Sequence, residues 1–274
     1  MRLPVLMHLS TELTGMLKDP AVLERATNAL LSSSEYQRGS SLPPFPLFPH
    51  SPSLSESDEE ALADLHQQLQ RLGKQAKAAG IRIDIDAEQT VRSPLSERTS
   101  QADFIQYFQP AIDRFYFLLA NEFNRNPSQP IIFNTIQCYL ADSTSAIQAA
   151  LAHARSFGYG FGAKLVRGAY MDSERVRAKK LGRPSPIHAT KEDTDASFDA
   201  CAAFMTNAIA EDMKAGKEAT AVMFASHNVA SVRKTLQDMT EKGLIKVEEG
   251  TFVFGDDARK RFAYGQLLGA CKLV

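Results

Sequence analysis

Apolar residues follow two alternating patterns along the chain, one typical of helices and the other typical of buried strands. Helical spacing marks segments at 20–31, 57–79, 110–123, 147–154, 198–213 and 229–239. Short apolar runs lie between them, at 1–10, 81–86, 130–133, 163–166, 219–224 and 261–268. Because helix and strand alternate strictly, the sequence predicts about six βα units around a parallel sheet. The expected fold is α/β, a (βα)8 barrel of the TIM type, which usually has about 250 residues.

Two stretches interrupt this alternation and are expected to be insertions within one domain spanning residues 1–274. Serine and proline dominate the first stretch, 32–56, which therefore predicts a loop without regular structure. A proline-rich ligand for a partner domain is the less favoured alternative. The second insertion is expected at about 91–102. Residues 251–260 are expected to be irregular before the last strand.

Cap residues predict where some helices begin and end. Ser57 and Glu60 have the spacing of a capping box at the start of the second helix, and Gly80 follows its last apolar position. After the strand at 163–166, Asp172 or Ser173 is expected to cap the next helix.

Composition excludes several classes of partner. Of the 274 residues 44% are hydrophobic and 23% charged, so the chain can bury a sizeable core. The net charge of −1 provides no bulk attraction to nucleic acid, and no apolar run approaches the roughly 20 residues that cross a bilayer. The N-terminus resembles neither a secretory signal nor a transit peptide. Cys138, Cys201 and Cys271 lack metal-ligand spacing and are expected to be free thiols in a reducing compartment.

Polar residues gather where predicted strands end. Lys164 and Arg167 flank the end of one strand and are followed by the small Gly168-Ala169 step, while Asp86 ends an earlier strand. In parallel α/β folds ligands bind at this edge, and a small residue lets a flat ligand approach the backbone. By itself an ordinary strand-to-helix turn with solvated cations is an equally good interpretation.

Five short blocks in order resemble the proline dehydrogenase family, of the eukaryotic mitochondrial type. They are IDAEQT (85–90), NTIQCYL (134–140), KLVRGAYM (164–171), ASHN (225–228) and YGQLLG (264–269). The resemblance runs from about residue 5 to residue 268 and implies a distorted eight-stranded βα barrel. It implies that the chain supplies the second to seventh strands, without the first strand, the last strand or the helix that caps the active-site mouth.

The resemblance implies FAD as cofactor and assigns residues to it. Gln137 is expected to hydrogen-bond the flavin ring, Lys164 to lie beside its reactive part and serve in catalysis, and Arg167 to reach the phosphates. Further contacts to the flavin, or to its adenylate end, are expected from Val166, Gly168, Ala169, Tyr170, Ser226 and His227. Without the resemblance, a glutamine at a strand end bonds backbone equally often, and a lone histidine is more often structural.

The resemblance also assigns residues to the substrate. Asp86 is expected near the substrate amine as a catalytic residue, with Tyr170 and Leu267 forming part of the pocket. His8 stands where the family has a lysine that contacts the substrate and its aspartate partner. Because histidine is shorter and only fractionally charged near neutral pH, we expect His8→Lys to reach Asp86 and lower KM for proline once the family's C-terminal end is restored. The alternative is that His8 points away from the pocket, as after a one-residue slip of register. Without the resemblance, Asp86 is more often a cap or an ion-pair partner, and Leu267 a core residue.

The implied reaction is FAD-dependent oxidation of L-proline to 1-pyrroline-5-carboxylate by hydride transfer to flavin N5, with electrons passed to a membrane quinone. The implied location is mitochondrial, on the matrix side of the inner membrane, with peripheral membrane association. The alternative is a non-catalytic fragment of the family, because the arginine pair of the family's capping helix is not matched and His8 replaces lysine. A weaker alternative is an unrelated phosphate-binding barrel enzyme such as an aldolase.

Overall fold

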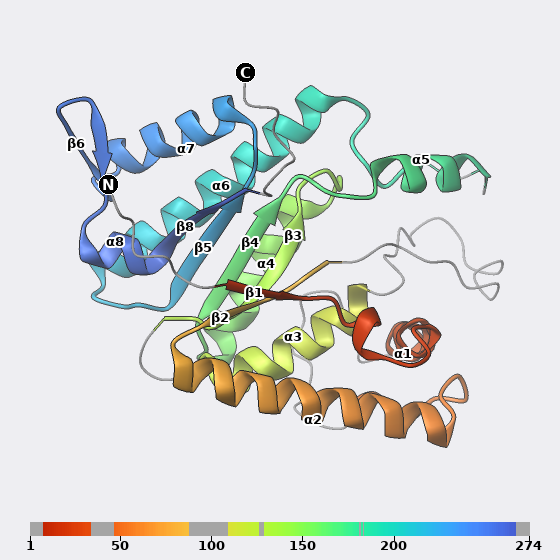
Figure 1. Ribbon diagram of the computed structural model, residues 1–274. Coiled ribbons are helices and arrows are strands. Elements are labelled where there is room, and N and C mark those ends of the chain that lie inside the picture. Colours follow the sequence, from red (N-terminus) through yellow and green to blue (C-terminus); the bar gives the residue numbers. More distant parts are fainter. Residues whose placement is uncertain are drawn as a thin grey trace.

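Six parallel strands form a curled half-barrel, in the order β1-β2-β3-β4-β5-β8 (Figure 1). The computed structural model describes residues 8–33, 47–87, 109–125, 129–180, 182 and 184–266. The strands are β1 (His8–Thr11), β2 (Arg82–Ile85), β3 (Ile132–Gln137), β4 (Phe161–Val166), β5 (Thr220–Ala225) and β8 (Phe262–Gly265). The predicted α/β fold with a parallel sheet is confirmed.

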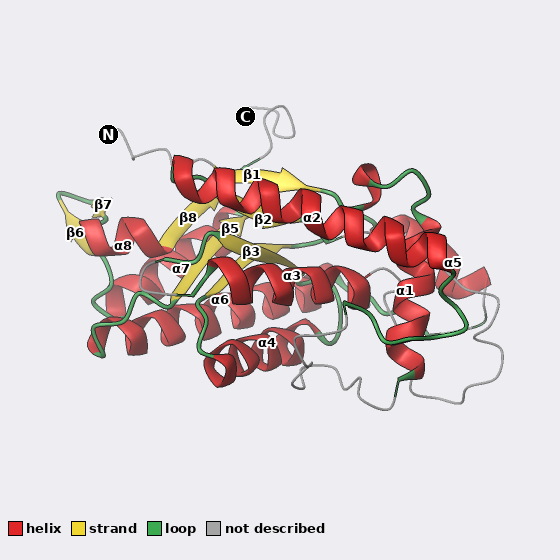
Figure 2. Ribbon diagram, turned by 90° about the horizontal axis from the view of Figure 1, so that it is seen from below, coloured by secondary structure: helices red, strands yellow, loops and turns green. Residues whose placement is uncertain are grey.

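Helices cover the convex side of this sheet (Figure 2). They are α2 (Glu56–Ala79), α3 (Gln109–Phe123), α4 (Ser143–Phe157), α6 (Lys191–Lys214) and α7 (Val229–Glu241). Helix α1 (Ala21–Ser32) packs on α2 and α3, and the short α8 (Asp256–Arg261) contacts β5 and β8. Helix α3 packs on β3, α4 on β3 and β4, and α6 on β4 and β5. Helix α5 (Met171–Lys180) instead lies beyond the strand ends, at the right of Figure 1. A one-turn 3-10 helix, η1 (Thr14–Met16), follows β1. None of the described helices combines the length and hydropathy needed to cross a bilayer.

Side chains alternate between the two faces of the sheet, as the pleat of a strand requires. On β2, Ile83 and Ile85 belong to the apolar core with the helices, whereas Asp84 lies on the opposite, concave face. On β4, Ala163 and Leu165 are buried in the same core, while Lys164 points to the concave side. The concave face therefore carries the charged side chains of the six strands.

The strand predicted at 130–133 begins later and is longer, as β3 (Ile132–Gln137). Its polar residues Asn134, Thr135 and Gln137 obscured the strand pattern, although all are buried. The start of β3 is determined by Asn124, whose side chain accepts hydrogen bonds from the N–H groups of residues 131 and 132 and donates to two backbone carbonyls.

Three further local expectations were wrong. The capping box of α2 is Ser55 with Asp58, two residues before the predicted pair Ser57 and Glu60. Helix α5 begins at Met171, so Asp172 lies in its first turn rather than before it. The stretch 251–260 is ordered, because β7 (Thr251–Val253) pairs with β6 (Lys246–Glu248) in a hairpin and α8 follows. Gly80 ends α2 with a left-handed backbone, as expected.

Much of both predicted insertions lies outside the described residues, namely 34–46 of the first and the whole of 91–102. In the described end of the first, Phe48 is buried and its ring lies 5.6 Å from that of Phe115 on α3. Cys138 and Cys201 are free and buried, whereas Cys271 lies outside the described residues.

A charged clamp joins α1 to the start of α2. Arg25 donates to both carboxylate oxygens of Asp58, at 2.9 and 2.7 Å, and also to Asp19 at 2.8 Å. The Asp58 carboxylate in turn accepts from the N–H of Ser55 and completes the capping box. The hydrogen bonds from Arg25, opposed by burial and assisted by those of Ser55, lower the pKa of Asp58 from 3.8 to about 2.

We expect Asp58→Asn to lower the free energy of unfolding by about 1–2 kcal/mol at pH 7, because the helix loses a charge-assisted bidentate contact. The folded-state pKa is depressed, so this stabilisation is complete above the unfolded value of 3.8 and is lost as the pH falls towards 2. Urea unfolding of both proteins at several pH values should therefore show the difference closing in acid. Asp19→Asn, at the exposed arm of the clamp, is the matched control and should have a smaller effect. A pH-independent difference for Asp58→Asn would contradict this explanation.

Candidate functional site at the carboxyl ends of the strands

Lys164 is the centre of the polar group on the concave face. Its ammonium donates to Asp86 Oδ1 at 2.6 Å and to Ser10 Oγ at 2.9 Å, and lies 4.0 Å from Asp84 Oδ2. Thr135 on the intervening strand β3 also donates to Asp86 Oδ1, at 3.3 Å. The Lys164 side chain is only 14% exposed, and that of Asp86 is 23% exposed. The structure thus joins two residues that the sequence singled out, Asp86 and Lys164, in one ion pair.

A second pair, His8 with Asp84, lies deeper on the same face. His8 Nδ1 is 2.8 Å from Asp84 Oδ1, and the two side chains are 8% and 1% exposed. In the strand register His8 lies opposite Arg82 on β2, four residues before Asp86, which follows that strand. His8 therefore contacts Asp84 rather than Asp86, its expected neighbour. Sequence reasoning missed Asp84, although its alternation with Ile83 and Ile85 placed it on the same face as Asp86.

Arg167 is held by side chains from the end of β5, from α6 and from α7. It donates to Ser226 Oγ at 3.3 Å and to Ser231 Oγ at 2.8 Å, forms an ion pair with Asp195, and stacks on the ring of Phe198. Burial raises the pKa of Asp195, but the Lys191 ammonium and the charge of Arg167 outweigh it, so that the pKa is lowered overall. The Arg167 charge is consequently balanced within the fold, a partnership that sequence did not predict.

The backbone from Val166 to Tyr170 continues past the end of β4 and is supported by Tyr139. The N–H groups of Cys138 and Tyr139 donate to the carbonyls of Val166 and Arg167, at 2.8 and 2.7 Å. Gly168 has φ of 137°, and a Cβ there would overlap the Tyr139 ring. The small residue at 168 is therefore explained by the ring behind it, and Ala169 follows on the same supported segment.

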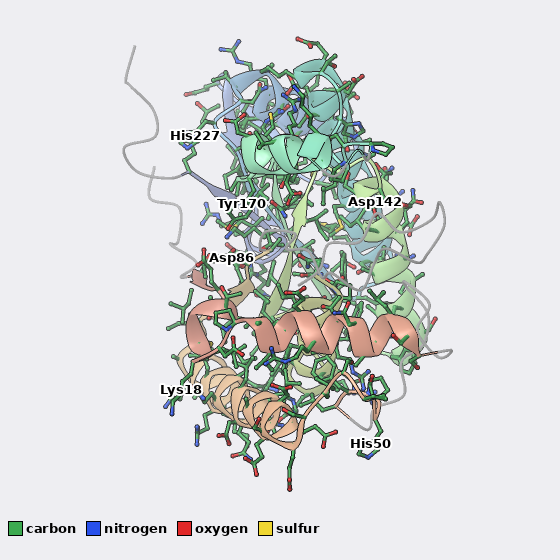
Figure 3. The ribbon with its side chains drawn as sticks, turned by 90° about the vertical axis from the view of Figure 1, so that its right-hand side faces the viewer. Lys18, His50, Asp86, Asp142, Tyr170 and His227 are labelled. Atoms are coloured by element: carbon green, nitrogen blue, oxygen red, sulfur yellow. The ribbon has the colours of Figure 1, made fainter. Side chains whose placement is uncertain are left out.

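The remaining predicted positions surround this segment. Gln137 is buried at the end of β3, and Ser226 and His227 follow β5, where Asn228 caps α7 through the N–H groups of residues 230 and 231. Figure 3 labels Asp86, Tyr170 and His227, which are spread along one side of the molecule, while Lys18 and His50 lie near α1 and α2. Leu267 lies outside the described residues.

The donor set suits a flat, polar ring more than a metal ion. Gln137 offers an amide, Lys164 an ammonium, and residues 166–170 a length of backbone backed by Tyr139. No group of three or more His, Cys, Asp or Glu side chains suited to a metal ion occurs in the part of the chain that the structure describes.

Comparison with known proteins identifies the family. Residues 9–271 match the family model described as proline dehydrogenase. The chain belongs to the proline dehydrogenase family. Human "Proline dehydrogenase 1, mitochondrial" is 38% identical over 226 residues, covering 81% of this chain but 32% of the human protein. A "Hydroxyproline dehydrogenase" from Xenopus laevis is 34% identical over 221 residues, covering 81% of this chain and 40% of that protein.

Solved structures agree on the fold. Proline utilization A (PutA) from Bdellovibrio bacteriovorus, in a form inactivated by N-propargylglycine, has a TM-score of 0.60 at 20% identity. The similarity covers 95% of this chain and 20% of that one. The chain thus corresponds to a minor part of the length of its relatives, and it has their barrel fold as a six-stranded half-barrel.

Gly168→Ala should destabilise the protein by about 2–4 kcal/mol, because Ala is strained at this backbone conformation and its methyl group overlaps Tyr139. Gly243→Ala is the matched control, since Gly243 also has positive φ, 69°, but no atom lies within 4 Å of a Cβ there. It should cost only about 1 kcal/mol. Thermal unfolding of both variants checks this. Equal losses would show that backbone strain alone, without Tyr139, determines the glycine at 168.

Proposed function

We propose that this chain forms the cofactor-binding and substrate-binding face of a proline dehydrogenase that uses FAD to oxidise L-proline to 1-pyrroline-5-carboxylate. The observation that carries the proposal is the Lys164–Asp86 ion pair, at 2.6 Å, on the strand next to Gln137 and followed by a partly exposed segment, 166–170. Membership of the family supports the reaction class. When bound, FAD would supply the redox chemistry by accepting a hydride from proline C5 at its N5 atom.

The residues at the end of β4 fit a flavin. Gln137 can both donate to and accept from the polar edge of the ring, and Lys164 provides a fixed positive charge beside it. The segment of Val166, Gly168, Ala169 and Tyr170 would lie along the ring. The Tyr139 ring packs against Gly168 and supports this segment from behind. Arg167, Ser226 and His227 would hold the phosphate and adenylate end. Because Asp195 already balances the charge of Arg167, Arg167 would contribute hydrogen-bond donors at the phosphates more than net positive charge.

Asp86 is suited to bind the substrate amine. Both hydrogen bonds that it accepts from described residues, those of Lys164 and Thr135, end at Oδ1. Its other carboxylate oxygen can therefore accept from a secondary ammonium without breaking the ion pair. Tyr170 and Leu267 would contribute the remaining contacts to the ring of proline. His8 would not contact the substrate and would act on the site only through its hydrogen bond to Asp84.

The electron acceptor that we propose is a membrane quinone, reached by peripheral association with the matrix side of the mitochondrial inner membrane. The mitochondrial relatives support the location. Hydroxyproline is the second candidate substrate, because the relative from Xenopus laevis is named for it.

Cofactor choice is tested by titrating the purified protein with FAD and, separately, with NAD, while measuring the heat of binding by calorimetry. We expect FAD to bind and NAD not to bind. Lys164→Met should weaken FAD binding roughly 10- to 100-fold, since a charge-assisted contact is worth about 1.5–3 kcal/mol. Lys234→Met is the control, because Lys234 is a surface residue paired with Asp199. Tight NAD binding without FAD binding would reject the proposal.

Substrate choice is tested by following dye reduction with L-proline and with hydroxyproline in the FAD-loaded protein. We expect proline to be preferred, and Asp86→Ala to raise KM roughly 10- to 100-fold through loss of a charge-assisted contact to the amine. Glu218→Ala, which removes a surface carboxylate paired with Lys260, should leave KM unchanged. FAD binding without turnover of either substrate would favour the non-catalytic alternative, and faster turnover of hydroxyproline would change the assigned substrate.

A further inference from the structure

The concave face carries two carboxylates but only one lysine between them. Lys164 Nζ lies 2.6 Å from Asp86 Oδ1 and 4.0 Å from Asp84 Oδ2. Asp84 lies on β2 and Asp86, two residues later, directly follows the strand, so both reach the same side of the sheet. Either could form the close contact with the ammonium. Asp84 and Asp86 thus compete for the ammonium of Lys164.

Asp84 has the greater intrinsic attraction for a cation, because it is more deeply buried. Its side chain is 1% exposed, against 23% for Asp86. A buried carboxylate without a counter-charge is costly, and coulombic attraction is stronger where water is excluded. Nevertheless the lysine makes its short contact with the shallower carboxylate. Some other group must satisfy Asp84.

His8 is that group. Its Nδ1 lies 2.8 Å from Asp84 Oδ1, and since a carboxylate only accepts, Nδ1 carries the proton. The edge of the ring packs against Phe133 at a centroid distance of 5.3 Å. The other ring nitrogen, Nε2, is buried and has no hydrogen-bond partner among the described residues, so Asp84 provides the polar contact that orients the ring.

We infer that His8 is a positioning residue. Because His8 hydrogen-bonds Asp84, the Lys164 ammonium pairs with Asp86, at the level where the substrate would bind. Stability alone is not a sufficient reason for the His8–Asp84 hydrogen bond, because replacing both partners of a buried hydrogen bond by apolar groups of similar shape can be neutral or stabilising. The part of the inference that concerns substrate rests on the proposed function. The part that concerns the choice of Lys164 between two carboxylates does not.

The inference predicts a specific non-additivity. In His8→Leu, Asp84 loses its partner and should draw the ammonium away from Asp86. In the double variant His8→Leu/Asp84→Leu the competing carboxylate is gone, and the ammonium should return to Asp86. The single variant should therefore be more impaired than the double one. A structural role for the pair predicts instead that the double variant, which loses both side chains, is at least as impaired.

The direct measurement is nuclear magnetic resonance of the cofactor-free protein, using couplings across hydrogen bonds between the lysine 15Nζ and the aspartate 13Cγ. We expect the coupling to Asp86 in the parent protein, a coupling to Asp84 in His8→Leu, and the Asp86 coupling again in the double variant. A Lys164–Asp86 coupling that is unchanged in His8→Leu would overturn the inference. Since no flavin or turnover is needed, this result is independent of the proposed function.

The kinetic measurement applies when the FAD-loaded protein oxidises proline. His8→Leu should lower kcat/KM roughly 10- to 100-fold, as displacement of a catalytic group by about 1 Å does, and the double variant should recover most of the loss. If His8→Leu does not fold, His8→Asn takes its place, because the asparagine amide retains a neutral donor near the position of Nδ1. His8→Asn should keep the Lys164–Asp86 coupling. Loss of that coupling in His8→Asn would refute the inference.

Discussion

The ammonium of Lys164 contacts Ser10 on β1 and Asp86, which directly follows β2, while its own backbone lies in β4. Neighbouring strands are about 4.8 Å apart, so β1 would lie about 14 Å from β4 across a flat sheet. The 2.9 Å contact between Lys164 and Ser10 is possible because the sheet curls and the lysine side chain is long. Curvature and charge are therefore coupled: a flatter sheet would separate the cation from its carboxylates and leave both partly buried without partners.

Two aromatic rings pack directly on glycines of β4 and of the segment after it. Phe133 fills the space that a side chain at Gly162 would occupy, and Tyr139 does the same at Gly168. Phe133 also meets the ring of His8 at 5.3 Å and the guanidinium of Arg82 at 5.1 Å. Burial lowers the pKa of Arg82 to about 10, and the backbone carbonyl of residue 260 together with Gln129 receives its N–H groups. At the floor of the concave face the Phe133 ring thus lies between the His8 ring and the Arg82 guanidinium, below the Lys164–Asp86 ion pair.

Sequence predicted the elements better than their contacts. Periodicity located the helices and strands because each depends on a local repeat, and strand ends indicated Asp86 and Lys164 as neighbours of a site. The start of β3 was displaced because its polar residues are buried by partners distant in sequence, such as the Asp113 that Asn134 contacts. The His8–Asp84 pair could not be predicted, since it depends on the register of two strands separated by more than 70 residues. The internal ion pair of Arg167 depends likewise on α6 approaching the end of β4.

This register changes what a lysine at position 8 would do. Considered from the sequence, such a lysine would extend to Asp86 and add a cation at the substrate level. In the structure its path begins opposite Arg82, and the first carboxylate on that path is Asp84, while Asp86 already has Lys164 at 2.6 Å. The added ammonium would therefore pair with Asp84, as His8 does. Only because a lysine side chain is longer than a histidine could the ammonium reach beyond Asp84 towards Asp86. Position 8 acts on the candidate site through Asp84, and the two residues have to be considered as one unit.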